Sequence, residues 1–291
     1  MDLNKLTGMI APIVSPFDKN EELDLNMTRK EIQYLLSTGI DGISTGGSTG
    51  EGVLLSNEEI RKIIEIMVEE NKKKIPIVAG IIRNSTREAI KTGLIAKKAG
   101  ADALLVTPVF YHGATPDGNY EYYKLIAEKV GLPTIVYNVV PTNQITPEVM
   151  LKIGKIKEVI GIKQVGIEAL VAMVYTCGDS IKVFSACDDM LYGTYVSGAC
   201  GAISAMITAV PELCVQQWKA FKKGDQKTAM EIQRKLYFVR EAYNFTPFPG
   251  MLKEIINQLG SPVGKARSPI LEPTKKEKEF IREKLMKAGL L

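Results

Sequence analysis

The clearest structural pattern in this chain lies in residues 134–163, which read TIVYNVVPTNQITPEVMLKIGKIKEVIGIK. The stretch begins with a short apolar run, Thr134–Tyr137, and ends with another, Val159–Lys163. Between them, Pro147–Lys155 has proline in its first turn, where helices accept it readily. Short apolar runs without polar alternation are typical of strands covered on both faces. The stretch therefore predicts one strand–helix–strand unit with parallel strands.

The same alternation recurs along most of the chain. Eight runs have the length and composition of strands: Met9–Val14, Gly42–Thr45, Ile75–Ala79, Ala103–Thr107, Thr134–Tyr137, Val159–Lys163, Ile181–Ser185 and Gly201–Ser204. The clearest helix-like segments are Asn57–Glu70, Ser85–Ala99, Pro116–Val130, Pro147–Lys155, Pro211–Lys223 and Gln226–Tyr243. Eight strands that alternate with helices predict an α/β protein with a TIM (β/α)8 barrel.

An open doubly wound sheet is the alternative architecture. A dinucleotide-binding fold of that kind places GxGxxG after its first strand, and this chain has no such motif there. No strand-like run follows Gln226. We therefore expect a barrel over residues 1–225 and a C-terminal helical extension over residues 226–291 that packs on it. Its last helix would be anchored by Phe280, Ile281, Leu285 and Leu290.

The composition excludes several classes of function. The net charge of +4 comes without a basic block interleaved with aromatics, so we expect no nucleic-acid partner. The single histidine, His112, excludes a two-histidine zinc motif and argues against a Ser-His-Asp triad. The four cysteines form no CxxC pair, which argues against a zinc or redox site. The N-terminal residues do not resemble a signal peptide, and no apolar run is long enough for a membrane span. We expect a cytoplasmic protein with no membrane contact.

In a TIM barrel the reacting side chains come from the C-terminal ends of the strands. Lys163 ends an apolar strand-like run. Burial disfavours the charged form of an amine, and the neutral amine is the nucleophile that forms a Schiff base with a ketone. Tyr137 ends the preceding strand and could act as general acid and base, with Ser48 as a proton-relay partner. The alternatives are a lysine that reaches solvent and an aromatic side chain at the barrel rim.

Two further strand ends carry polar residues. After the second strand comes the loop GGSTGE, residues 46–51, whose glycines allow close approach of a ligand and whose Ser48 and Thr49 could bind a carboxylate. The loop lacks the GK[ST] ending of a nucleotide-binding P-loop. After the seventh strand come Asp188 and Asp189, which could bind substrate hydroxyls or lie in a solvated turn. No other acidic cluster lies at the strand ends, so we expect no metal and no cofactor.

Taken together, GGSTGE, Tyr137-Asn138 and Gly161-Ile162-Lys163 resemble the dihydrodipicolinate synthase / N-acetylneuraminate lyase family of class I aldolases. The resemblance covers nearly the whole chain. It implies a TIM barrel with a C-terminal helical region, a metal-free Schiff-base mechanism on pyruvate or another 2-keto acid, and a homotetramer built as a dimer of dimers. It implies that Lys163 is the Schiff-base lysine, Tyr137 the acid/base and Ser48 part of the relay. By the same resemblance, Thr49, the adjacent backbone at Gly47, and Ile203 form the pyruvate pocket.

The chain departs from the family pattern in three places. In the family, the neighbouring subunit supplies a tyrosine to the proton relay. At the best-matching position this chain has Phe110, and the adjacent Tyr111 is the candidate for the role. The synthase branch has an arginine shortly after the tyrosine strand, and this chain has none between Tyr137 and Gln144. The stretch around Asp188 is more similar to the lyase branch, in which an acidic pair contacts substrate hydroxyls.

We therefore expect a carbon–carbon lyase or aldolase that acts on a hydroxylated 2-keto-3-deoxy acid. Asn143 would offer a neutral hydrogen bond to the substrate, and Asp188 would contact its hydroxyls. Three alternatives stay open: 4-hydroxy-tetrahydrodipicolinate synthase, which joins pyruvate to aspartate semialdehyde; a 2-keto-3-deoxy acid dehydratase with the same lysine; and a non-catalytic barrel that binds a keto acid.

Overall fold

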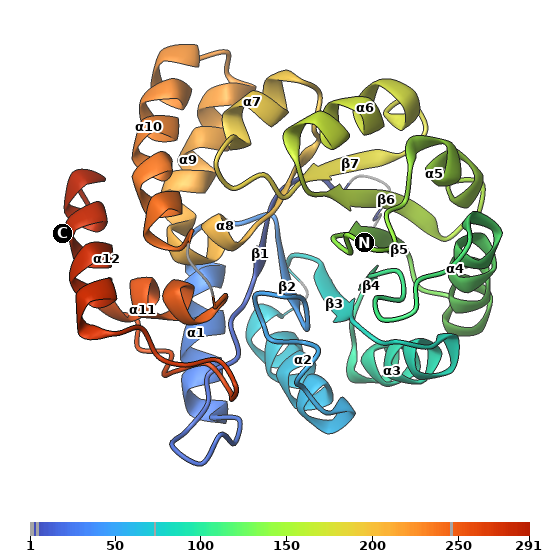
Figure 1. The fold of residues 1–291 in the computed structure, drawn as a ribbon, viewed down its shortest axis with the longest axis horizontal. Coiled ribbons are helices and arrows are strands. Elements are labelled where there is room, and N and C mark those ends of the chain that lie inside the picture. The colour runs from blue at the N-terminus through green and yellow to red at the C-terminus, as the bar shows by residue number, and fades with distance from the viewer. Residues whose placement is uncertain (1–2, 4–5, 73, 245–246) are drawn as a thin grey trace.

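Eight parallel strands form a closed barrel in which each strand pairs with its neighbours in sequence and β8 pairs with β1 (Figure 1). The structure, a computed structural model, describes residues 3, 6–72, 74–244 and 247–291. The strands are β1 (Gly8–Pro12), β2 (Gly42–Thr45), β3 (Ile77–Ile81), β4 (Ala103–Val106), β5 (Thr134–Asn138), β6 (Val159–Gln164), β7 (Lys182–Ser185) and β8 (Gly201–Ile203). The prediction of a TIM barrel is confirmed, and the open doubly wound sheet is excluded.

The inside of the barrel is packed with its own set of apolar side chains. Eight strand residues form a buried cluster separate from the one under the helices: Ile10, Val78, Ala103, Leu105, Ile135, Tyr137, Phe184 and Ile203. Leu3 and Leu6, which precede β1, belong to the same cluster. Because side chains alternate between the two faces of a strand, Tyr137 of β5 shares the inward face with Ile135 two residues before it. The packed interior leaves the strand ends as the place where polar groups can gather.

The outer ring consists of helices that follow the strands. These are α1 (Leu25–Ser37), α2 (Asn57–Asn71), α3 (Thr86–Ala99), α4 (Pro116–Val130), α5 (Pro147–Ile153), α6 (Ile167–Cys177), α7 (Leu191–Val196), α8 (Ala205–Ala209) and α9 (Pro211–Lys222). α2 starts with a full capping box, in which the side chains of Ser56 and Glu59 each accept a hydrogen bond from the other residue's backbone amide. Side-chain caps also start α3 at Ser85 and α4 at Thr115.

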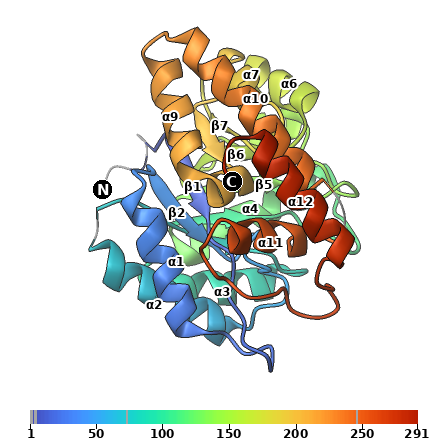
Figure 2. The same ribbon diagram turned by 90° about the vertical axis from the view of Figure 1, so that its left-hand side faces the viewer.

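Three more helices follow the barrel: α10 (Gln226–Ala242), α11 (Gly250–Gln258) and α12 (Lys275–Lys287). Figure 2 shows them on the side of the barrel where α8 and α9 lie, and α10 packs against α9 and α12. Ile281 and Leu285 of α12 are fully buried, whereas Phe280 and Leu290 are only partly buried. Leu236, Ile255 and Ile281 belong to the same hydrophobic cluster as residues under the ring helices. The C-terminal helices therefore share a core with the barrel. Among the helices described, none is long and apolar enough to cross a membrane.

Candidate active site

Lys163 and Tyr137 lie side by side at the C-terminal ends of two paired strands. They are register partners in the β5–β6 ladder, and the lysine Nζ lies 4.0 Å from the centroid of the tyrosine ring. Lys163 is 5% exposed and Tyr137 is 3% exposed. The ammonium forms no ion pair with any residue that the structure describes. An amine held against an aromatic ring with little access to water is well placed for covalent chemistry on a carbonyl.

The hydroxyl of Tyr137 reaches a residue 89 positions earlier in the chain. It donates a hydrogen bond to Ser48 Oγ over 3.1 Å. Ser48 is partly exposed, so it can pass a proton between the tyrosine and a bound molecule or water. The structure thus brings together Lys163, Tyr137 and Ser48, three of the four residues predicted to be catalytic, the fourth being Tyr111.

The loop that carries Ser48 and Thr49 is tightly folded. Gly46 has a φ of +67° and its backbone lies against Gly80, where a side chain on either glycine would collide. The amide of Glu51 donates to the carbonyl of Ser48 over 3.1 Å. Thr49 is buried. In contrast, a side chain on Gly47 would meet no atom within 4 Å, so the backbone at Gly47 borders open space in which a ligand can sit.

Asp188 follows β7 at the same end of the barrel and is already hydrogen-bonded within the protein. Tyr243 donates to its Oδ2 over 2.9 Å, and Ser204 donates to its Oδ1. Burial raises the pKa of Asp188, although the two hydroxyls and the positive charges of Arg240 and Lys163 act in the opposite direction. Each carboxylate oxygen keeps a second lone pair, so a substrate hydroxyl can still donate to Asp188.

Two other predicted substrate-binding residues lie nearby in different surroundings. Ile203 ends β8 inside the barrel and is fully buried. Asn143 is buried as well, and its side-chain amide bonds the side chain of Asn119 and the carbonyl of Val109. These bonds join the loops after β4 and β5, so the side chain of Asn143 supports the rim. Its contact with a substrate stays a prediction.

Within the described part of the chain, the side chain of Tyr111 makes no hydrogen bond or ring contact with Lys163, Tyr137 or Ser48. Its side chain is 77% exposed and packs edge-on against His112, with 4.8 Å between the ring centroids. The amides of Phe110 and Tyr111 both donate to Asn84 Oδ1, which fixes the backbone of this loop. A side chain that reaches the active site of a neighbouring subunit needs an ordered backbone and must point outward, and Tyr111 meets both requirements. The role of Tyr111 stays a prediction.

The structure also shows a contact that nothing in the sequence singles out. Lys253 of α11 lies beneath the GGSTGE loop, with its Nζ 2.6 Å from Glu51 Oε1. Both side chains are 1% exposed. Lys253 belongs to an amphipathic helix more than 200 residues away, so only the packing of the C-terminal helices reveals the pair.

Metal-ligating side chains and the Cys187 thiol are the other chemical groups of interest near the rim. No set of three or more His, Cys, Asp or Glu side chains in the described part of the chain is arranged to hold a metal ion. Burial raises the pKa of the Cys187 thiol to about 11, which keeps it protonated near neutral pH. Cys187 therefore acts as a small buried side chain.

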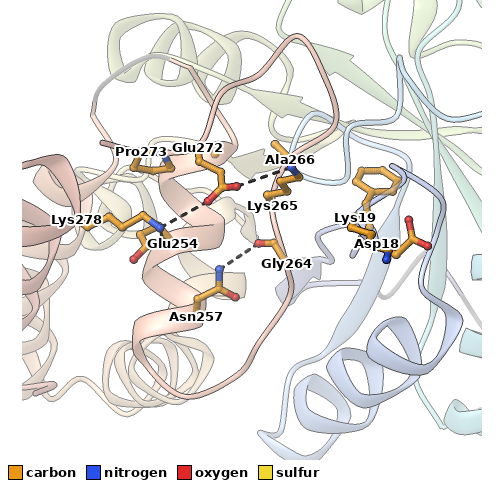
Figure 3. Close-up of a pocket in the computed structure, with 12 residues that line it drawn as sticks. Asp18, Lys19, Glu254, Asn257, Gly264, Lys265, Ala266, Glu272, Pro273 and Lys278 are labelled. Atoms are coloured by element: carbon orange, nitrogen blue, oxygen red, sulfur yellow. Dashed lines mark hydrogen bonds and ion pairs between the residues drawn. The ribbon is translucent and has the colours of Figure 1, made fainter. Parts of the chain in front are cut away.

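A pocket of about 340 Å³ lies outside the rim, between the Asp18–Lys19 turn and the C-terminal segment (Figure 3). Its charged side chains pair with one another: Lys278 lies 3.3 Å from Glu254 and 3.7 Å from Glu272, and Lys265 lies 3.8 Å from Glu272. None of the predicted site residues lines it.

Comparison with known proteins matches residues 5–288 to the model of the dihydrodipicolinate synthetase family. Among curated relatives, the 4-hydroxy-tetrahydrodipicolinate synthase of Bartonella tribocorum is 35% identical over 98% of this chain and 99% of its own. The enzyme of the same name from Nitratidesulfovibrio vulgaris is also 35% identical, over 99% of this chain and all of its own.

Solved structures agree. Dihydrodipicolinate synthase from Thermotoga maritima superimposes with a TM-score of 0.93 at 29% identity, covering 99% of this chain and 100% of that chain. A prophage protein of the dihydrodipicolinic acid synthase family from E. coli K12, solved in complex with pyruvate, gives a TM-score of 0.94 at 28% identity, covering 98% and 99% of the two chains. The chain therefore belongs to the dihydrodipicolinate synthetase family of pyruvate-dependent class I aldolases.

Proposed function

We propose that this enzyme forms a Schiff base between Lys163 and pyruvate. The bound pyruvate then forms a carbon–carbon bond with a hydroxylated aldehyde to give a 2-keto-3-deoxy acid, and the same enzyme cleaves that acid in the reverse direction. The observation that carries the first half is the buried lysine beside Tyr137, whose hydroxyl reaches Ser48. The pyruvate complex of the similar E. coli protein supports the choice of keto acid.

The proposed steps follow from this geometry. The neutral Nζ of Lys163 adds to C2 of pyruvate, and the former carbonyl oxygen leaves as water after Tyr137 and Ser48 relay the required protons. Loss of a proton from C3 gives the enamine. C3 then bonds to the aldehyde carbon, whose oxygen takes up a proton, and water hydrolyses the Schiff base to release Lys163. Cleavage of the 2-keto-3-deoxy acid runs through the same steps in reverse.

We place the pyruvate carboxylate at the GGSTGE loop. Gly47 borders open space there, and Thr49 lies in the same turn. Backbone amides in a tight glycine-rich turn, together with a hydroxyl, suit a carboxylate. Ile203 would contribute from the end of β8.

The choice of aldehyde depends on the loop after β5. A second carboxylate on the substrate calls for a cation, best a bidentate arginine, and the loop from Asn138 to Gln144 contains neither lysine nor arginine. Asp188 on the same rim would repel a carboxylate and accept hydrogen bonds from hydroxyls. Both features favour a hydroxylated aldehyde.

The second candidate is 4-hydroxy-tetrahydrodipicolinate synthase, since the curated relatives at 32–35% identity bear that name. In that reaction the aldehyde is aspartate semialdehyde, and its carboxylate would need a partner other than an arginine in the loop after β5.

We further propose a homotetramer in which paired subunits exchange the Tyr111 loop. The 77% exposure of Tyr111 supports this assembly, whereas one similar structure is described as a monomeric dihydrodipicolinate synthase variant. Light scattering of the purified protein measures the subunit number directly, and a monomer with full activity would contradict the exchange.

Borohydride trapping tests the Schiff base. Incubation with pyruvate and sodium borohydride should leave a reduced adduct on Lys163 that peptide mass spectrometry locates, and Lys163→Met should abolish it. Lys182→Met provides the matched control, because Lys182 begins β7 and so lies at the other end of the barrel. An unmodified Lys163 with pyruvate and with longer 2-keto acids would contradict an enzymatic role and favour a binding barrel.

The choice of aldehyde is tested by product. Pyruvate with a hydroxylated aldehyde such as glyceraldehyde should give a 2-keto-3-deoxy acid, with kcat/KM at least tenfold above that for aspartate semialdehyde. The reverse preference would establish the synthase. Formation of a dioxo acid from a 2-keto-3-deoxy acid, without release of pyruvate, would establish a dehydratase.

A further inference from the structure

The GGSTGE loop rests on a charged group supplied by the C-terminal helices. The ammonium of Lys253 lies 2.6 Å from Glu51 Oε1 and donates hydrogen bonds to the carbonyls of Ser15 over 2.6 Å and Lys265 over 2.9 Å. Three oxygen atoms therefore surround the ammonium: two backbone carbonyls that accept its hydrogen bonds, and Glu51 Oε1 as its ion-pair partner. Phe17 covers the ammonium from another side, with 4.6 Å to the ring centroid.

Two of these contacts connect Lys253 to the loop, one through Glu51 and one through Ser15. Glu51 is the last residue of GGSTGE, and its amide closes the turn onto the carbonyl of Ser48. Its other carboxylate oxygen accepts from the amide of Arg267 over 2.8 Å. Ser15, whose carbonyl binds Lys253, donates from its own hydroxyl to the carbonyl of Gly50 over 2.7 Å. Lys253 therefore holds the loop in two ways: directly through its ion pair with Glu51, and indirectly through Ser15, which bonds to Gly50.

We propose that Lys253 is a positioning residue for the pyruvate site: it holds the turn at Glu51 and Gly50 so that Ser48 meets Tyr137 and Thr49 meets the pyruvate carboxylate. The inference rests on the proposed function, which gives Ser48 and Thr49 their tasks. It assigns the C-terminal extension a part in substrate binding, although no residue of that extension needs to touch the substrate.

The chemistry of the contact argues against a purely stabilising role. A fully buried ion pair adds little net stability over an apolar pair of the same size, because both charges lose their hydration. The pair does fix the orientation of the groups that it joins, because the ammonium is held by three oxygen atoms at once. A shift of about 1 Å in a substrate-binding group can lower a rate by roughly a hundredfold, so fixed directions matter most beside a reactive site.

The test compares Lys253→Met with the double variant Glu51→Gln/Lys253→Met. Each is titrated with pyruvate in the borohydride assay, which reports the pyruvate concentration that gives half-maximal labelling of Lys163. We expect this concentration to rise by roughly tenfold or more in Lys253→Met. The double variant removes the unpaired buried charge, so its thermal stability should recover relative to Lys253→Met while the pyruvate requirement stays high.

Lys284→Met is the matched control. It removes an ion pair of the same 2.6 Å length, between Lys284 of α12 and Glu241 of α10, which does not contact the loop. Its half-maximal pyruvate concentration should equal that of the unmodified enzyme. If Lys253→Met does not fold, Glu51→Gln alone carries the test, because it keeps an acceptor for Lys253; it should raise the pyruvate requirement about threefold.

The outcomes separate the two proposals. No adduct in the unmodified enzyme would contradict the proposed function itself. An adduct in the unmodified enzyme, with the same pyruvate dependence in the double variant, would overturn the positioning role. Recovery of stability and pyruvate binding together in the double variant would show that Lys253 serves only the packing of α11, and would also overturn it.

Discussion

Glu51 and Asp188 are two carboxylates at the same end of the barrel, one after β2 and one after β7, and the C-terminal helices hold them in opposite ways. Glu51 receives a buried cation, Lys253, and a backbone amide. Asp188 receives two neutral hydroxyls, from Ser204 and from Tyr243 at the end of α10. Glu51 is sealed from solvent, whereas Asp188 is partly exposed and lies close enough to Lys163 to be affected by its charge.

The difference teaches what each carboxylate can do. A cation in contact with a buried carboxylate compensates its lost hydration, so Glu51 is committed to holding the loop. Hydroxyls compensate less, and burial still raises the pKa of Asp188. Asp188 is therefore the carboxylate at the rim whose protonation and hydrogen bonds can respond to a substrate.

The largest effect is expected from Glu51→Ala, which leaves Lys253 buried without its anion. Breaking a buried pair from one side costs about 3–5 kcal/mol of the free energy of unfolding. Urea denaturation measures the loss. Glu283→Ala is the control, since it removes an exposed pair with Lys287 of the same 2.6 Å length, and exposed pairs contribute at most about 1 kcal/mol. Equal losses in the two variants would refute the contrast between buried and exposed pairs.

The barrel could be predicted because its strands carry their signal locally. All eight predicted strands are present, and β2 was predicted at its observed bounds. β3 begins two residues later than predicted, because Ile75 is bonded to Asn71 of the preceding helix before the ladder starts. Two of the helices that the sequence did not single out have features that obscure them. α1 buries Thr28 and Glu31 on its inner face, and α6 is apolar without a side-chain cap.

The pairing of Tyr137 with Lys163 could be predicted for a different reason. Tyr137 and Lys163 each lie one residue before the end of consecutive strands, and consecutive strands of a barrel are neighbours, so their meeting follows from sequence order alone. The residues that hold Glu51 and Asp188 in place do not follow from sequence order. Lys253 and Tyr243 come from helices whose placement depends on tertiary packing, and a lysine in an amphipathic helix looks like a solvent-exposed residue until the structure buries it.

A smaller and pH-dependent effect is expected from Asp188→Asn. A carboxyl whose pKa is raised by folding binds a proton more readily in the folded state, so it favours folding at low pH and loses that contribution as the pH rises above its usual value of 3.8. The amide does not titrate. Asp188→Asn should therefore cost about 1–3 kcal/mol in acid, from imperfect hydrogen bonds, and less as the pH rises.

Denaturant titrations at several pH values between 3 and 8 give the comparison, with Tyr243→Phe as the companion variant. Tyr243→Phe removes one donor to Asp188 and should steepen the pH dependence that Asp188→Asn abolishes. If the loss of unfolding free energy in Asp188→Asn grew with pH, Asp188 would be stabilised as an anion, like a carboxylate beside a cation. The contrast with Glu51 would then fail.

The smallest effect is expected from Ser15→Ala, which removes the hydrogen bond from Ser15 to Gly50 and leaves the ion pair between Lys253 and Glu51. The backbone carbonyl of Ser15 still accepts from Lys253, and only the hydroxyl bond to Gly50 is lost. We expect a loss of about 1 kcal/mol in unfolding free energy and about a twofold rise in the pyruvate concentration for half-maximal labelling. Ser37→Ala is the control, because Ser37 makes a hydroxyl-to-carbonyl bond of the same 2.7 Å length on the exposed end of α1. If Ser15→Ala raised the pyruvate requirement as much as Lys253→Met does, the loop would depend on its bond to Ser15, and the ion pair at Glu51 would be secondary.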